Sequence, residues 1–93
     1  MKKLSQAEVT TRMIEIPNWR LHEGKLHREF QFRNFIEAFQ FMTGCALLAE
    51  QMNHHPEWFN VYKTVRVDLH THDVNGISEK DFMLAKAMSS LVD

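Results

Sequence analysis

Apolar residues recur at helical spacing in three stretches of the chain. The first begins at Ser5, which has the spacing of a capping box with Glu8. The second follows Asn34, a good N-cap residue, and covers residues 35–51. The third follows Ser78 and continues to the C-terminus. The pattern therefore predicts three helices, separated by stretches of a different periodicity.

Between the predicted helices, apolar and polar residues alternate, as they do in strands with one buried face. This alternation covers residues 19–22, 26–32, 58–61 and 64–71. The turn Glu23-Gly24-Lys25 joins the first two strands into a hairpin, and a second hairpin follows Pro56. Because proline disfavours helical geometry in the residue before it, we expect Pro56 to stop the second helix.

The resulting order of elements is αββαββα. Strands in hairpins with helices between them give an antiparallel sheet whose helices gather on one side. We therefore expect an α+β fold in which a four-stranded antiparallel sheet carries helices packed on one face. A chain of 93 residues has room for one core, so residues 1–93 are expected to form a single domain.

The second helix carries two apolar stripes rather than one. The stripes are Phe35, Phe39, Met42, Ala46 and Ala49, and Phe41, Cys45, Leu48 and Met52. A helix that is apolar on two sides packs against two neighbours, here the sheet and a neighbouring helix or a second subunit. Gly44 lies in the middle of this helix, where glycine costs about 1 kcal/mol relative to alanine.

Composition narrows the classes of function. The formal net charge of −1 argues against a protein that mainly binds the phosphate backbone of nucleic acids. No apolar run approaches the length of a membrane span, and none follows the first residues as in a signal peptide. The single cysteine, Cys45, has no internal disulfide partner, which suits a reducing compartment. We therefore expect a cytoplasmic protein that binds neither nucleic acid nor membrane.

Histidines are the main candidates for chemistry. They are His22, His27, His54, His55, His70 and His72. The first two flank a hairpin turn, where we expect solvated surface. The adjacent pair follows the second helix, and the last two come at the end of the last strand. Since that strand is expected to pair with the one that starts after the adjacent pair, all four should meet at one end of the sheet.

Spacing alone leaves three interpretations of this histidine cluster open. A metal site is one, since His-x-His on a strand is a ligand pattern, although Cys45 belongs to the buried helix. General acid–base catalysis is the second, because one imidazole can donate a proton near neutral pH while another accepts one. Glu50, one helical turn before His54, would then orient that ring, and Trp58 would wall the pocket. The third is that the histidines are only polar caps.

A longer pattern runs through the cluster. It consists of Glu50, His54-His55-Pro56, Tyr62, His72 and Asp81, with the unbroken run His54-His55-Pro56-Glu57-Trp58-Phe59-Asn60-Val61-Tyr62. Upstream it continues through Trp19, Glu23-Gly24, Phe30-x-Phe32 and Phe39-x-Phe41-Met42. This pattern resembles that of the pterin-4a-carbinolamine dehydratases over most of the chain, and it is loosest in the first helix.

The resemblance implies an enzyme that dehydrates 4a-hydroxytetrahydropterin to quinonoid dihydropterin, with no bound cofactor and no metal. It implies His54, His55 and His72 as the catalytic residues. We assign proton transfer on the two faces of the pterin ring to His54 and His72, and positioning of the substrate to His55. Glu50 would support His54, and Asp81 would support the site from the start of the last helix.

The resemblance also implies a substrate-binding set. Its members are Asn53, His54, His55, Trp58, His70, Thr71, His72 and Asp73. Two of them depart from the animal members, which commonly have Asp in place of Asn53 and Ser in place of His70. These departures bear on fine substrate preference rather than on the reaction.

The family further implies partners. Its members form dimers, and some form tetramers through their long helices, so we expect a homodimer or homotetramer through residues 35–51. Functional coupling to an aromatic amino acid hydroxylase, whose pterin cofactor would be recycled, is also expected. Two alternatives remain open: a non-catalytic dimerisation or regulatory partner protein, and a pterin-related role in molybdenum-cofactor metabolism.

Overall fold

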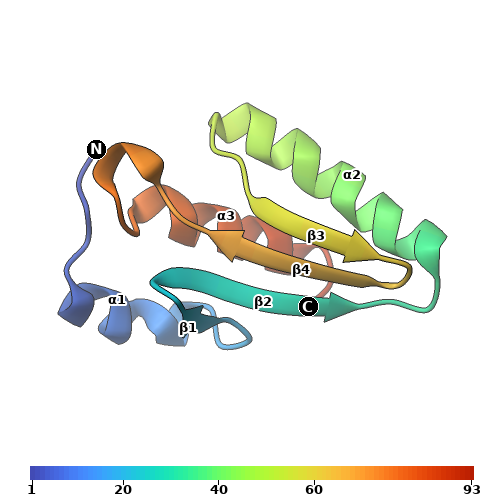
Figure 1. Ribbon diagram of the computed structural model, residues 1–93, viewed down its shortest axis with the longest axis horizontal. Helices are drawn as coiled ribbons and strands as arrows, with labels where there is room; N and C mark the ends of the chain where they lie inside the picture. Colours follow the sequence, from blue (N-terminus) through green and yellow to red (C-terminus); the bar gives the residue numbers. More distant parts are fainter.

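The computed structural model describes residues 1–93 as an antiparallel sheet with helices on one face (Figure 1). The elements are α1 (Gln6–Arg12), the 3-10 turn η1 (Met13–Glu15), β1 (Arg20–His22), β2 (Lys25–Gln31), α2 (Phe35–Met52), β3 (Glu57–Val61), β4 (Thr64–Leu69), the 3-10 turn η2 (His72–Val74) and α3 (Glu79–Ser90). The predicted order αββαββα and the α+β class are confirmed.

The sheet has the strand order β1-β2-β4-β3, so β2 and β4 are its central strands. Alternation puts five apolar side chains on its inner face, all of them buried: Leu26, Phe30, Val65, Val67 and Leu69. Leu26 lies opposite Leu69 and Phe30 opposite Val65 in the β2–β4 pair, so both central strands share this face.

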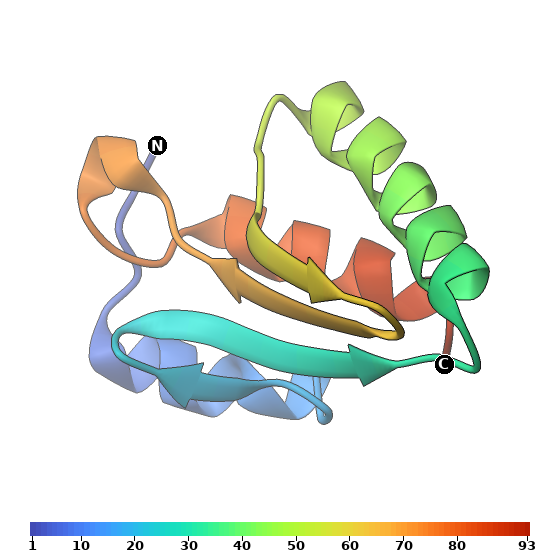
Figure 2. The same cartoon turned by 45° about the vertical axis from the view of Figure 1, so that its right-hand side comes forward.

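The three helices cover that inner face, and α3 lies between α1 and α2 in both views (Figures 1 and 2). Their core residues include Val9 of α1, Phe41 and Cys45 of α2, and Phe82 and Met88 of α3. Burial raises the pKa of the Cys45 thiol to about 12, which leaves it protonated and unreactive at neutral pH. Cys45 is therefore a packing residue of the core.

The second predicted stripe of α2 faces the core, and the first is covered only in part. Phe41 and Cys45 of the second stripe and Ala49 of the first are buried, whereas Phe39 of the first is 53% exposed. Leu47, which lies in neither stripe, is 70% exposed. The apolar outer side of α2 is thus open in the single chain, which is unusual for side chains of this size. None of the helices combines the length and the apolar character that crossing a membrane requires.

The end of α2 differs from the prediction that Pro56 stops it. The helix ends at Met52, because Asn53 adopts the left-handed conformation with φ 53° and its N–H caps the carbonyls of Ala49 and Glu50. Asparagine tolerates this conformation better than most residues do. The last strand is also shorter than predicted, since β4 ends at Leu69 and His72 lies in η2.

Gly44 lies close to the C-terminal segment, and this contact accounts only in part for a glycine in the middle of α2. A Cβ at Gly44 would lie 3.2 Å from Cδ1 of Leu91, the end of a flexible and half-exposed side chain. Because Leu91 can move, we expect Gly44→Ala to raise the free energy of unfolding by about 0.5–1 kcal/mol through helix propensity.

Urea unfolding of Gly44→Ala, alone and combined with Leu91→Ala, measures this effect. A substitution that destabilises the wild-type background but stabilises the Leu91→Ala background would show instead that the contact with Leu91 is rigid.

Candidate active site

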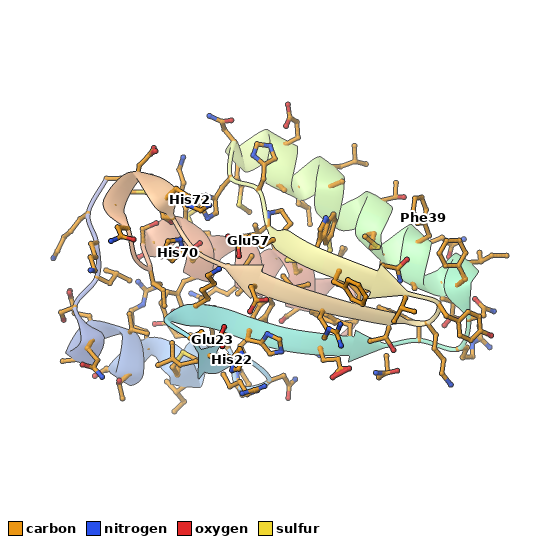
Figure 3. All side chains as sticks on the ribbon, in the orientation of Figure 1. His22, Glu23, Phe39, Glu57, His70 and His72 are labelled. Atoms are coloured by element: carbon orange, nitrogen blue, oxygen red, sulfur yellow. The ribbon has the colours of Figure 1, made fainter.

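The structure brings four histidines together at one end of the sheet, where α2 and β4 both end. They line a cavity of about 190 Å³ made by Asn53, His54, His55, His70, Thr71, His72 and Asp73. Figure 3 shows His70 and His72 at this end, beyond the tip of β4. Of the eight residues expected to bind substrate, seven line this cavity and Trp58 does not.

His54 is the buried member of the group, with 9% of its surface exposed. Its Nε2 lies 2.6 Å from Oδ1 of Asp81, a carboxylate with no exposed surface. An ionised carboxylate only accepts hydrogen bonds, so Nε2 carries the proton in this pair. No hydrogen bond in the structure uses Nδ1, which leaves that ring nitrogen for a ligand in the cavity.

Asp81 is held by the start of α3. Its Oδ2 accepts hydrogen bonds from the Thr71 hydroxyl at 2.7 Å and from the Ser78 N–H at 2.9 Å. The Ser78 and Asp81 pair is a capping box, and the helix N-terminus favours a negative charge there. The carboxylate that completes the capping box of α3 is therefore the same one that orients His54.

His55 pairs with Glu50, whose Oε1 lies 2.9 Å from His55 Nε2, and both side chains are largely exposed. The prediction that Glu50 orients His54 is wrong in this geometry. The helical spacing behind it fails because Asn53 turns the chain into the left-handed conformation between the two residues. Glu50 thus faces the histidine that lies one residue further on.

His72 is 80% exposed and lies 3.5 Å through Nε2 from Oε2 of Glu57. The other oxygen of Glu57 accepts a hydrogen bond from Lys25 at 2.6 Å, which raises the pKa of Lys25. Figure 3 shows Glu57 on the same side of the sheet end as His72. Glu57 was missed in the sequence, although strand alternation could have found it.

The same alternation explains why Trp58 does not wall the cavity. Trp58 lies opposite Val67, a buried residue of the inner face, and packs against the core. Its neighbour Glu57 lies opposite Asp68 and points to the outer face. Trp58 therefore packs on the inner face of the sheet, whereas the Glu57 side chain lies on the outer face and reaches His72.

The remaining histidines differ from one another. His70 stands edge-on against His72 with ring centroids 5.2 Å apart, and its Nδ1 is buried without a hydrogen-bond partner. His27 pairs through Nδ1 with Asp68 at 2.8 Å and is mostly covered, so it is not the solvated residue we expected. His22 and His27 lie outside the cavity. No three side chains of His, Cys, Asp or Glu are grouped to hold a metal ion.

Three histidines of the cavity thus have separate carboxylate partners. His54 has the buried Asp81, His55 the exposed Glu50, and His72 the half-exposed Glu57. A carboxylate at one ring nitrogen fixes the orientation of an imidazole and stabilises its protonated form. Such a group of rings can protonate one atom of a small ligand while removing a proton from another.

Comparison with known proteins gives consistent matches over the whole chain. Residues 2–91 match the family described as pterin 4 alpha carbinolamine dehydratase. A relative from Solibacter usitatus that carries this dehydratase name is 54% identical over 89 residues, which cover 96% of this chain and 94% of the relative. One from Prochlorococcus marinus strain MIT 9303, named in the same way, is 52% identical over 88 residues, which cover 95% and 92%.

A solved structure matches as well. The crystal structure of a transcriptional coactivator/pterin dehydratase from Brucella melitensis superposes with a TM-score of 0.94 at 37% sequence identity. The match covers 99% of this chain and 100% of that chain.

Asp81 offers a direct test of the site's construction. Asp81→Ala leaves the buried donors of His54, Thr71 and Ser78 without their acceptor, so we expect it to lower the free energy of unfolding by about 3–5 kcal/mol. Urea unfolding measures this loss. Asp73→Ala, which removes an exposed carboxylate without hydrogen bonds at the same cavity, should stay within about 0.5 kcal/mol of wild type. Equal losses in the two variants would contradict the supporting role of Asp81.

Proposed function

Since the chain belongs to the pterin 4 alpha carbinolamine dehydratase family, we propose that it is a hydro-lyase that dehydrates 4a-hydroxytetrahydropterin to quinonoid dihydropterin. The observation that carries this proposal is the cavity where His54, His55 and His72 meet, each beside its own carboxylate. The dehydration needs one proton delivered to a hydroxyl and another removed from a nitrogen, and this is chemistry that paired imidazoles perform.

The proposed reaction moves two protons. A protonated imidazole donates its proton to the hydroxyl on carbon 4a, and the carbon–oxygen bond breaks to release water. A neutral imidazole takes the proton from N5, whose electron pair forms the double bond to carbon 4a. We assign these steps to His54 and His72 on the two faces of the ring, with His55 positioning the substrate. Asp81 and Glu57 lie where they stabilise the positive charge that alternates between those two rings.

The other residues of the cavity differ in whether their polar groups are free to bind substrate. The N–H, carbonyl and hydroxyl of Thr71 all make hydrogen bonds within the protein, so Thr71 shapes the cavity without a free polar group. The side chains of Asn53, His70 and Asp73 make no hydrogen bonds and line the cavity. A pterin carries adjacent N–H donors on its pyrimidine edge, and we propose that the Asp73 carboxylate and the Asn53 amide receive them.

The proposed role in the cell is recycling. Quinonoid dihydropterin is the oxidised form that a reductase returns to the tetrahydropterin used by an aromatic amino acid hydroxylase. We propose functional coupling to such a hydroxylase in the cytoplasm, where Cys45 would stay the free thiol seen in the structure.

A second candidate function rests on the name of the Brucella melitensis protein, which includes a coactivator role. The outer side of α2 gives this candidate a physical basis here, since Phe35, Ile36 and Phe39 form a shallow apolar groove of about 360 Å³ with Gln40 and Thr43. We propose that this side of residues 35–51 joins copies of the chain into a homodimer or homotetramer. A regulatory partner would use the same surface, with or without catalysis.

The dehydratase proposal is tested by following the decay of freshly generated 4a-hydroxytetrahydropterin, with and without the protein. Because the substrate also dehydrates unaided, the rates must be compared. We expect acceleration by the wild type, and a loss of about 10²–10³-fold in kcat for His72→Ala, the value of one general acid or base. His72 is exposed, so its removal leaves the core intact.

His22→Ala serves as the matched control, because His22 is also exposed but lies outside the cavity. It should retain wild-type kcat. No acceleration by the wild type would refute the dehydratase proposal, and equal losses in the two variants would refute the role of His72.

Light scattering tests the proposed assembly. Wild type should have the mass of a dimer or tetramer, and Phe39→Glu should shift it toward the monomer by placing a charge in the apolar groove. Ile14→Glu alters an apolar residue that is 84% exposed elsewhere on the surface, and it should not change the mass. A monomeric wild type at high concentration would rule out this interface.

A further inference from the structure

Lys25 does not line the histidine cavity, but it is bonded to a residue that contacts one of the histidines. It is the first residue of β2, and its Nζ donates a hydrogen bond to Oε1 of Glu57 at 2.6 Å. Because β4 lies between β2 and β3, this bond spans two strand spacings, about 10 Å, across the outer face of the sheet. None of the proposed proton transfers uses Lys25.

The two oxygens of Glu57 have different partners. Oε1 accepts the hydrogen bond from Lys25, and Oε2 lies 3.5 Å from Nε2 of His72. A carboxylate that is held at one oxygen by a charged donor has little freedom to rotate, so its other oxygen stays directed at the histidine. Lys25, Glu57 and His72 thus form a chain of contacts that joins β2, β3 and η2.

The ring of His72 has little else to fix it. The side chain is 80% exposed, and neither ring nitrogen makes a hydrogen bond. Its other neighbour is the ring of His70, which stands edge-on at 5.2 Å and is itself without hydrogen bonds. His54, by contrast, is buried and held by Asp81 at 2.6 Å. The orientation of His72 therefore depends on where Glu57 lies.

The position of Glu57 depends in turn on a cation. Glu57 lies directly opposite Asp68 in the β3–β4 pair, and like charges in this arrangement repel each other. Lys25 lies between attractions from Glu57, Asp68 and Glu23, and the hydrogen bond from Glu57 is the largest cause of its raised pKa. The lysine is therefore charged at neutral pH, and without it the two opposed carboxylates would move apart.

We infer that Lys25 is a positioning residue for the proposed dehydration, because it fixes Glu57 and Glu57 in turn fixes the ring of His72 where that ring lines the cavity. The expected effect on the rate rests on the proposed dehydratase function, whereas the expected effect on the ring of His72 does not. Lys25 supplies a positive charge at the end of a long side chain. Arginine has both properties, and methionine has similar length without the charge.

Steady-state kinetics of two variants tests the role of the charge. Lys25→Met should lower kcat about three- to fivefold, the value of a partly exposed ion pair, and leave KM within about twofold, since Lys25 does not touch the substrate. Lys25→Arg should keep most of the wild-type kcat. Lys63→Met removes an exposed lysine from the β3–β4 turn, at the other end of the sheet, and should change neither constant.

A double-mutant cycle tests whether Lys25 acts through Glu57. In a Glu57→Ala background, Lys25→Met should lower kcat by less than about 1.5-fold, because the link to His72 is already broken. The full three- to fivefold loss in that background would overturn the inference, as would an unchanged kcat of Lys25→Met in the wild-type background.

The ring of His72 is observed directly by carbon-13 relaxation of the free protein, which needs no substrate. Its order parameter should be high in wild type and in Lys25→Arg, and in Lys25→Met it should fall toward the range below about 0.6 that marks flexible groups. The same order parameter in wild type and Lys25→Met would overturn the inference.

The two kinds of measurement separate this inference from the proposed function. A wild-type protein that does not accelerate the dehydration would refute the dehydratase proposal, and relaxation of the His72 ring would then decide alone whether Lys25 orders it. Acceleration by wild type, together with a loss in Lys25→Met that Lys25→Arg does not recover, would keep the dehydratase proposal and overturn the role of the charge.

Discussion

The buried carboxylate of Asp81 is the interaction on which the functional end of this molecule depends. It accepts hydrogen bonds from His54, from the Thr71 hydroxyl and from the Ser78 N–H, and it has no exposed surface. These partners come from the end of α2, the end of β4 and the start of α3. A charge buried without such partners would be costly, so the fold must hold all three elements in place around it.

The sequence predicted the general form of the site because simple periodicities determine it. Alternating residues defined the strands, and hairpin pairing of β3 with β4 returned His70 and His72 to the neighbourhood of His54 and His55. The capping pair of α3 was also visible in the sequence. These features depend on local spacing and on one pairing rule, and both were accessible without coordinates.

The pairing of side chains within the site was not accessible in this way. Glu50 contacts His55 rather than His54, because Asn53 takes a left-handed conformation. The spacing of apolar and polar residues does not predict this conformation. Strand alternation is enough to put Trp58 on the buried face and Glu57 on the outer one, but it does not show that Glu57 meets His72, which lies in η2 beyond the end of β4. A shift of one residue in register or one change in a backbone angle alters such contacts completely, although it leaves the fold unchanged.

The position of Asp81 along the chain has a consequence for biosynthesis. All six histidines precede α3, and the carboxylate that orients His54 belongs to α3 itself. Until the residues of α3 have been made and have emerged from the ribosome, a nascent chain lacks the group that organises the buried imidazole. The site is therefore completed only when α3 docks on the sheet and closes the core.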